Sequence, residues 1–230
     1  NLALNMMHEY VAKSNTSNLK LKILEIGSGG GTITNLLKEF GKVYANDISK
    51  EALELCKNKD IKNLILGDIN ILDLKEYKNK FDAVLALDVL EHIQDDVETI
   101  KRVNTLLKEN GIFLINVPAY KFLWSVHDEA LEHKRRYASY EIKQKLVDNG
   151  FEILKESYFV TFVFFIIAFF KVLSNFIDRT PYPKTSYVLL PDKLNSLMVK
   201  ILNLEIKLMQ KFRLPFGTTF TVVAKKKKNV

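Results

Sequence analysis

The chain has 230 residues, 47% of them hydrophobic, which is enough to fold around a sizeable core and excludes a disordered chain. Its 34 lysines and arginines outnumber 27 acidic residues, so the net charge of +7 favours anionic partners without identifying one. The one cysteine, Cys56, excludes an internal disulfide framework and fits a reducing cytosolic compartment. No signal peptide is visible, and the start at Asn1 leaves room for a preceding segment.

Strand and helix patterns alternate along most of the chain. A first helix is predicted over residues 2–13, followed by a polar linker over 14–18. Helices are then expected near 32–40, 49–58, 95–108 and 138–149, and strands near 21–26, 42–46, 63–67, 82–87 and 112–117. This alternation predicts an α/β, Rossmann-like fold, in which helices cover both faces of a parallel sheet.

The turn after the first strand is rich in glycine. Gly27 and Gly29 allow a tight turn in which the backbone can approach a ligand, and the next helix directs its N-terminal N–H groups at the turn. The dinucleotide pattern G-x-G-x-x-G would need glycine at position 32, which is Thr32, whereas Gly31 is the third glycine. The turn therefore predicts a nucleotide-type cofactor site that departs from the dinucleotide pattern.

Acidic residues lie at or near the ends of four predicted strands, at Glu25, Asp47, Asp68 and Asp88. Asp47 lies twenty positions after Gly27, the spacing at which a carboxylate can bind ribose hydroxyls. In a parallel sheet these carboxyl ends meet at one edge, where ligands bind. The four acids are therefore expected around one cofactor.

The series acid-x-Gly-x-Gly-x-Gly from Glu25 to Gly31, with the three later acids, resembles the class I S-adenosylmethionine (SAM) methyltransferases. The resemblance implies a seven-stranded, mostly parallel sheet whose last strand is antiparallel. It also implies SAM as the cofactor, with Asp68 bonding the adenine amino group. The cofactor-binding residues would be Glu25, Gly27, Ser28, Gly29, Gly31, Asp47, Ile48, Asp68, Ile69, Leu87, Asp88 and His92.

More than fifty residues separate the last two predicted strands, near 155–162 and 217–225, which is long for a connection. We expect one methyltransferase domain over 1–230, with a helical insertion at 163–214 between strands six and seven. The run 158–170 is uncharged and rich in phenylalanine, but the part beyond the strand, about 15 residues, is too short to span a bilayer. It remains open whether it forms a core or dimer helix, an interfacial membrane helix or a lid over an apolar substrate.

A second part of the insertion, residues 194–212, predicts an amphipathic helix. Glu205 falls on its apolar stripe, and we expect it to form a salt bridge with a nearby lysine or arginine. Arg213 and the lysines at 225–228 lie close in sequence. Apolar helices with basic residues favour contact with an anionic membrane, although a lysine-rich tail is commonly just solvated.

The segment after the fifth strand concentrates groups that could act on a methyl acceptor. It resembles the corresponding loop of a subgroup of bacterial class I methyltransferases often encoded beside glycosyltransferases. We predict His127 as the general base, oriented by Asp128, because direct displacement requires at most one proton to leave the acceptor. The predicted substrate-binding residues are Trp124, His133, Arg135, Arg136 and Tyr137, with an arginine holding an anionic group.

Asp88, Glu91 and His92 also resemble the acid-x-x-Glu-His motif of ubiquinone-pathway O-methyltransferases, where these side chains can hold a divalent ion. The spacing would put all three on one face of a helix. The first residue is aspartate instead of the usual glutamate, and many relatives carry Glu-His without a metal. The preferred expectation is therefore no metal, with His92 near the methionine end of the cofactor.

These features predict a cytoplasmic methyltransferase that acts on oxygen or nitrogen of a small or amphiphilic, envelope-related acceptor, with peripheral contact to the inner face of the membrane. Two alternatives remain. A nucleic-acid methyltransferase would fit the positive charge, but an appended RNA-binding module and the Asn/Asp-Pro-Pro-aromatic tetrapeptide are missing, so no nucleic acid is expected. A non-catalytic SAM-binding scaffold would use the insertion as its partner surface.

Overall fold

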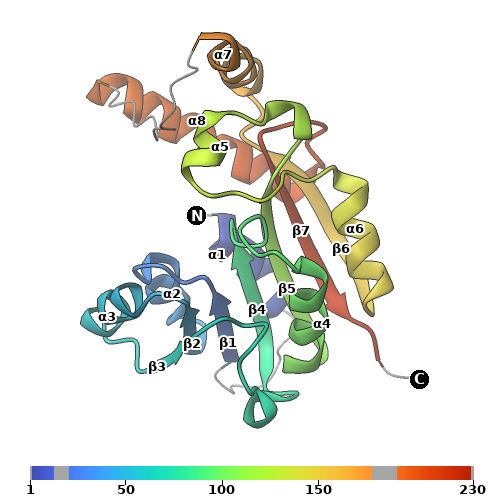
Figure 1. Ribbon diagram of the computed structural model, residues 1–230. Helices are drawn as coiled ribbons and strands as arrows, with labels where there is room; N and C mark the ends of the chain where they lie inside the picture. Colours follow the sequence, from blue (N-terminus) through green and yellow to red (C-terminus); the bar gives the residue numbers. More distant parts are fainter. Residues whose placement is uncertain (1, 13–20, 178–190, 229–230) are drawn as a thin grey trace.

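The computed structural model describes residues 2–12, 21–177 and 191–228 (Figure 1). Within these residues the chain forms a seven-stranded sheet in the order β3-β2-β1-β4-β5-β7-β6. The strands are β1 (Leu21–Ile26), β2 (Gly41–Asp47), β3 (Asn63–Leu66), β4 (Phe81–Leu87), β5 (Leu107–Pro118), β6 (Phe151–Phe159) and β7 (Thr219–Lys226). Strands β1 to β5 pair in parallel, and β7 runs antiparallel between β5 and β6. The predicted fold class is confirmed.

Two layers of helices cover the sheet. On one face, α4 (Asp96–Leu106) and α6 (Ser139–Asp148) bury side chains against β4, β5 and β7. On the other face lie α1 (Leu2–Met7), α2 (Thr32–Leu37), α3 (Lys50–Asn58) and the C-terminal half of α8 (Asp192–Lys211). The first helix is shorter than predicted, because a π-helical turn (His8–Ala12) follows α1. Each face of the sheet thus has its own apolar core, because successive side chains of the buried strands point to opposite faces and both faces are covered by helices.

The remaining helices gather beyond the carboxyl ends of the parallel strands (Figure 1). A short helix α5 (Val126–Ala130) lies in the segment after β5, and α7 (Phe164–Ile177) precedes α8 between β6 and β7. Figure 1 shows α5, α7 and α8 close to one another at this end of the molecule. Among the described residues, no helix combines the length and the apolar character needed to cross a bilayer.

Glu205 anchors α8 to the beginning of the insertion. Its side chain is fully buried, as the apolar stripe predicted. Its two oxygens accept hydrogen bonds from the backbone N–H groups of Thr161 (3.1 Å) and Phe162 (2.6 Å). Among the described residues no lysine or arginine forms the predicted salt bridge with it. Backbone donors bind this carboxylate instead, where the chain turns sharply at Val160, whose φ is +61°.

Candidate functional site

The glycine turn after β1 adopts a conformation that favours glycine at three positions. Gly27, Gly29 and Gly31 have φ of +65°, +50° and +73°. A Cβ on Gly27 would lie 2.4 Å from Val89 Cγ2, and one on Gly31 would lie 2.7 Å from Cys56 Sγ. At Gly29 no atom lies within 4 Å of such a Cβ. Gly27 and Gly31 are therefore required by packing, whereas Gly29 faces open space where a ligand can approach the backbone.

Asp47, at the end of β2, holds this turn in place. Its Oδ2 accepts the Gly29 N–H at 2.8 Å, and its Oδ1 accepts the Ser49 N–H at 2.9 Å. Asp68, after β3, is exposed and accepts the Asn70 N–H through Oδ1 at 2.8 Å. Both carboxylates keep further lone pairs for ligand hydroxyl or amino groups, because each oxygen can accept more than one hydrogen bond.

Two adjoining cavities lie at this edge of the sheet. The first, about 560 Å³, is lined by predicted cofactor residues Gly27, Gly29, Asp47, Ile48, Asp68, Ile69, Asp88 and His92. The second, about 500 Å³, is lined by Glu25, Gly27, Ser28, Leu87 and Asp88, and by Asn116, Phe159, Val199, Leu202, Asn203 and Ile206. Gly27 and Asp88 belong to both walls, so the cavities meet at the tips of β1 and β4. Gly31 lines neither cavity and instead packs against Cys56 and Ile61 on the other side of the turn.

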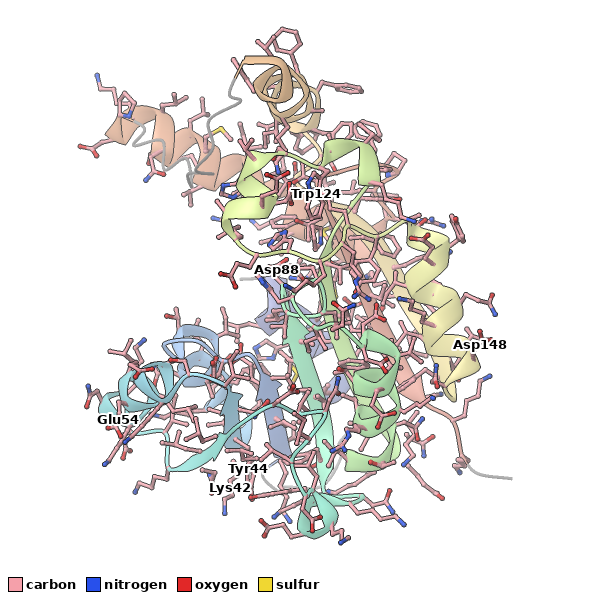
Figure 2. All side chains as sticks on the ribbon, viewed as in Figure 1. Lys42, Tyr44, Glu54, Asp88, Trp124 and Asp148 are labelled. Atoms are coloured by element: carbon pink, nitrogen blue, oxygen red, sulfur yellow. The ribbon has the colours of Figure 1, made fainter. Side chains whose placement is uncertain are left out.

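Glu25 and Asp88 are carboxyl groups in partly dehydrated surroundings. Burial raises the pKa of Glu25 to about 7, although the Thr34 hydroxyl donates a hydrogen bond to it. Asp88 is accessible from the cavities, yet the surrounding protein removes enough water to raise its pKa. Asp88 also has a left-handed φ of +54°, an uncommon conformation for a residue other than glycine. Figure 2 marks Asp88 between the sheet edge and the segment that carries Trp124.

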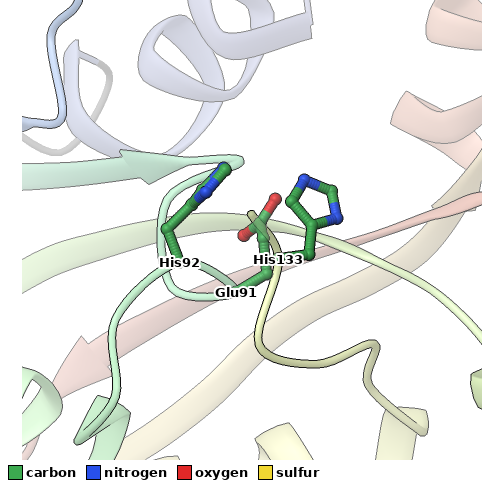
Figure 3. Close-up of side chains that lie close together, drawn as sticks. All are labelled: Glu91, His92 and His133. Atoms are coloured by element: carbon green, nitrogen blue, oxygen red, sulfur yellow. The ribbon is translucent and has the colours of Figure 1, made fainter. Parts of the chain in front are cut away.

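Beyond Asp88, the side chains of Glu91, His92 and His133 converge (Figure 3). One ligand atom from each lies within 4.8 Å of the others. Oε2 of buried Glu91 has no hydrogen-bond partner among the described residues, and burial, together with the charge of Asp88, raises the pKa of Glu91 to about 8. One carboxylate and two imidazoles are a donor set that suits zinc or iron. The predicted trio differs, because His133 takes the place of Asp88.

Asp128 is the centre of a buried polar cluster, but it does not orient His127. Its Oδ1 accepts hydrogen bonds from His133 Nδ1 at 3.0 Å and from Arg136 Nε at 2.8 Å. Its Oδ2 accepts from the backbone N–H and the hydroxyl of Ser125, each at 3.0 Å, and from Lys171 Nζ of α7 at 3.2 Å. The predicted His127–Asp128 pair therefore needs correction: among the described residues, the histidine bound to this carboxylate is His133.

The charges of this cluster set the protonation of His133. Burial alone would raise the pKa of Asp128, but Arg136 and Lys171 outweigh it and hold that pKa at about 2. An ionised carboxylate only accepts hydrogen bonds, so His133 must donate its Nδ1–H, which leaves Nε2 as the basic nitrogen. Burial lowers the pKa of His133 and outweighs the contact with Asp128, so the ring is neutral at pH 7. The His133 ring meets the edge of His92, a residue of the first cavity wall, at 4.7 Å between centroids.

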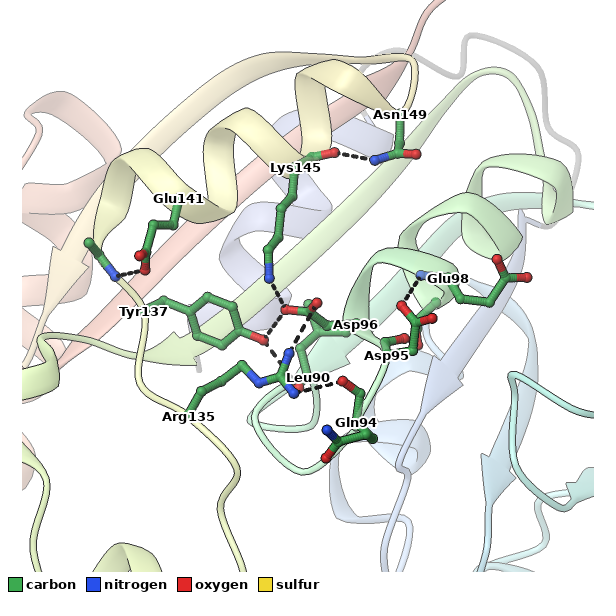
Figure 4. A network of polar contacts seen from close by, with 12 residues as sticks. Leu90, Gln94, Asp95, Asp96, Glu98, Arg135, Tyr137, Glu141, Lys145 and Asn149 are labelled. Atoms are coloured by element: carbon green, nitrogen blue, oxygen red, sulfur yellow. Dashed lines mark hydrogen bonds and ion pairs between the residues drawn. The ribbon is translucent and has the colours of Figure 1, made fainter.

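The other predicted substrate residues lie in the same segment but are committed to protein partners. Tyr137 is buried, and its hydroxyl donates to Asp96 Oδ2 at 2.7 Å, with the Leu90 carbonyl as a second, more distant acceptor at 3.1 Å (Figure 4). Arg135 pairs with the same Asp96 at 3.2 Å. Arg136 is buried against Asp128, and Trp124 donates to Glu129 at 3.3 Å. Tyr137 and Arg136 therefore support the segment from inside. Trp124, Arg135 and Arg136 also line a cavity of about 400 Å³ together with Lys121 and Lys134, and their contact with a substrate stays a prediction.

Some residues of the site were not predicted from the sequence. Lys171 is the one charged residue in the run from 158 to 177, and that interruption of an apolar run was the signal for a buried ionic partner. Asn116 at the end of β5 and the inward side chains of α8 line the second cavity. The period of α8 indicated which side chains point inward, but it could not show that they reach the cofactor edge.

The chain is similar to known methyltransferases. A family model for a methyltransferase domain matches residues 24–115. A ubiquinone biosynthesis O-methyltransferase from Pelagibacter ubique is 33% identical over 115 residues, which cover 48% of each chain. An uncharacterized protein from Methanocaldococcus jannaschii is 28% identical over 156 residues, covering 65% of this chain and 61% of that protein. The chain thus spans about half the length of the first of these relatives.

A solved SAM-dependent methyltransferase from Archaeoglobus fulgidus superposes with a TM-score of 0.60, covering 98% of this chain and 95% of that one. At 18% identity this likeness bears on the fold alone. The matched domain contains the glycine turn and the four acid-tipped strands, and the cofactor of that family is SAM. By the match over residues 24–115 and by its strand order, the chain contains a methyltransferase domain of the class I, SAM-dependent type.

Proposed function

We propose that the protein transfers a methyl group from SAM to an oxygen or nitrogen atom of a small or amphiphilic acceptor. The observation that carries the proposal is the junction of two cavities at Gly27 and Asp88. One cavity has the carboxylates and the open Gly29 backbone that suit an adenosine; the other has apolar walls from α8. A donor that occupies the glycine side would meet an acceptor on the other side at this junction.

SAM would supply a methyl group on a sulfonium, whose sulfur leaves as a neutral thioether and needs no acid. The residues of this chain must then hold the acceptor in line and accept the proton that it loses. Asp47, Asp68 and the Gly29 turn would hold the donor, since their free lone pairs and the open backbone face the first cavity. The first task of the protein is therefore alignment.

His133 is our candidate for the proton acceptor. It is neutral at pH 7, its Nδ1–H is held by Asp128, and its ring borders His92 in the wall of the first cavity, which meets the second cavity at Asp88. Glu91, with a pKa of about 8, lies beside both histidines and is protonated at pH 7. Because this carboxyl already carries its proton at pH 7, the neutral imidazole is the group left to accept a proton at this place.

The composition of the second cavity supports an acceptor with an apolar part. Leu202, Ile206 and Phe159 line it together with the amides of Asn116 and Asn203. Apolar walls with a few polar groups are typical of sites for small or amphiphilic ligands. A lipid-linked or other envelope-related acceptor on the cytoplasmic side would suit this lining.

Calorimetry and a transfer assay test the proposal. We expect SAM and S-adenosylhomocysteine to bind, a nicotinamide dinucleotide not to bind, and Asp47→Ala to weaken SAM binding at least about tenfold through loss of the Gly29 contact. Glu54→Ala, an exposed change on α3, is the control. Transfer of labelled methyl from SAM to a lipid or aqueous cell extract would support catalysis. Binding without transfer to any extract would favour the scaffold, and dinucleotide binding would refute the proposal.

A further inference from the structure

Helix α7 exposes a face that consists entirely of apolar side chains. Phe165, Ile166, Phe169 and Phe170 are each 61–69% exposed, and Leu173 is 37% exposed. Their spacing places all five on one side of the helix. Phe162, just before α7, is 52% exposed. Contiguous exposed apolar side chains of this size are unusual on a protein surface and mark a surface that another molecule covers.

The opposite side of α7 contacts the protein and carries its one charge. Phe164 is buried against Tyr120 and Phe216, with ring centroids 5.6 and 5.5 Å apart. Lys171, two turns later, donates to Asp128 and Ser125. Lys171, the only charged residue of α7, thus points inward, and the outward side chains that are described between Phe165 and Leu173 are all apolar. The orientation of α7 is fixed by these contacts.

Helix α8, which lies near α7 (Figure 1), carries a row of cations. Lys193, Lys200, Lys207 and Lys211 are exposed and recur at intervals of seven, seven and four, so they share one side of the helix. That side is opposite to buried Glu205, Ile206 and Met209. Asp192 is the one exposed acid on α8, since Glu205 is buried against the backbone of Thr161 and Phe162. The outward side of α8 is therefore strongly positive.

We propose that α7 and α8 form a docking surface for a lipid bilayer that contains anionic phospholipid. The exposed phenylalanines of α7 would enter the boundary between headgroups and acyl chains, and the lysine row of α8 would contact the anionic headgroups. Charge decides between a bilayer and a second copy of the chain. A two-fold dimer through this surface would place the two lysine rows near each other, which is repulsive, whereas an anionic bilayer complements them.

The docking surface lies beside the second cavity, because α8 belongs to both. Its inward residues Leu202 and Ile206 line that cavity, and Val199 lines it while being 49% exposed. An acceptor with an apolar part would reach the cavity from the bilayer along α8. Membrane docking itself does not depend on methyl transfer, so the two proposals can fail separately.

Vesicle flotation tests the docking surface. The full chain is mixed with vesicles of phosphatidylcholine alone, or of equal parts phosphatidylcholine and phosphatidylglycerol. We expect the wild type to float with the mixed vesicles only. The variant Phe165→Ser/Phe169→Ser/Phe170→Ser should lower this partitioning at least about tenfold, since each buried aromatic ring contributes strongly to transfer from water. The variant Lys193→Gln/Lys200→Gln/Lys207→Gln should lower it as well, by removing the attraction to anionic lipid.

Matched controls change the same kinds of residue elsewhere. Leu55→Ser/Ile71→Ser/Val147→Ser removes three exposed apolar side chains, and Lys57→Gln/Lys62→Gln/Lys101→Gln removes three exposed lysines. Both control variants should float like the wild type. Calorimetry with S-adenosylhomocysteine on every variant reports whether the fold and the cofactor site are kept, independently of lipid.

Three results would overturn the proposal. The wild type could stay unbound with both kinds of vesicle, or the phenylalanine variant could float as well as the wild type. Alternatively, sedimentation could show a wild-type dimer that the phenylalanine substitutions dissociate, in which case a second copy covers the surface. If the wild type does not bind S-adenosylhomocysteine, the proposed function is refuted and the docking result is unaffected.

Discussion

Asp128 binds the imidazole of His133 across 3.0 Å, although its neighbour in the sequence is His127. The short helix α5 ends just after Asp128, and the chain reverses at Glu132, where φ is +58°. The reversal is held by the His133 N–H, which donates to the Asp128 carbonyl at 2.9 Å. Local chain geometry thus selects which of two histidines becomes the partner of the buried carboxylate.

The first prediction separates these two histidines. His133→Ala should lower kcat for methyl transfer about 100-fold or more, the usual contribution of a positioned general base, while SAM binding stays within about twofold. His127→Ala should leave kcat within a few-fold of the wild type, because Asp128 holds His133 instead. The rate of methyl transfer to the acceptor found in the extract assay is measured for each variant in single-turnover experiments. Equal losses in the two variants would contradict the assignment.

The second prediction concerns the glycine turn. Gly31→Ala should lower the free energy of unfolding by about 1–3 kcal/mol, because φ is +73° and the new Cβ would press against Cys56. Gly30→Ala is the matched control, since its Cβ would first meet Leu55 at 3.4 Å, an ordinary contact. Denaturant unfolding of both variants without cofactor measures the difference. Similar stability losses at positions 30 and 31 would show that the turn is not strained by a side chain.

The strand pattern was sufficient to predict the sheet and its cofactor edge. Parallel strands that are buried on both faces have short apolar runs as their sequence pattern. The acids at their carboxyl ends lie at the edge of the sheet where ligands bind. Thus Asp47 and Asp68 line the first cavity, as the alternation of elements indicated. This part succeeds because each strand is specified locally and the topology of parallel strands leaves few alternatives.

Contacts that depend on chain reversals could not be predicted in this way. The periodicity of α8 placed Glu205 inward, but its partners are backbone N–H groups of a turn more than forty residues earlier. A pattern of side chains gives no sign of such donors. The histidine partner of Asp128 was mispredicted for the same reason, because its contact with His133 depends on a left-handed residue at Glu132. The sequence places Lys171 in an apolar run, but only the packing of α7 on α5 reveals Asp128 as its partner.

The third prediction concerns the anchor of α8. Glu205→Ala should lower the free energy of unfolding by about 2–4 kcal/mol, because two buried N–H groups lose their acceptor. Glu205→Gln should cost about half as much, since its amide oxygen can still accept one of these bonds. Glu54→Ala, an exposed change, should stay within about 0.5 kcal/mol of the wild type. Chemical denaturation of the three variants gives the order, and an equal effect of Ala at 205 and 54 would contradict this anchor.

The fourth prediction is a pH dependence that originates at Glu91. Its pKa is about 8 in the folded chain, against about 4.5 when unfolded. Between these values the folded state holds a proton that the unfolded state has released, so the contribution of Glu91 to stability falls as pH rises from about 5 to about 8. Glu91→Gln removes this loss, because the amide stays neutral at every pH. The variant should therefore match the wild type near pH 5 and exceed it at pH 9 by about 2–4 kcal/mol.

The difference in stability between the wild type and Glu91→Gln reports on Glu91 alone, because the nearby histidines titrate in both proteins. The pKa of His92 and of His133 is lowered by burial, so these groups destabilise the fold in acid and contribute equally to wild type and variant to a first approximation. Denaturation is measured with a chelator present, so that no ion bound by Glu91, His92 and His133 enters the comparison. Glu54→Gln serves as the exposed control and should show no pH-dependent difference. If the stability difference between Glu91→Gln and the wild type stayed constant from pH 5 to pH 9, Glu91 would be ionised throughout this range. His133 would then lie beside a negative charge, which raises the pKa of its imidazole. More of the ring would be protonated at pH 6, and His133 would be a poorer proton acceptor there.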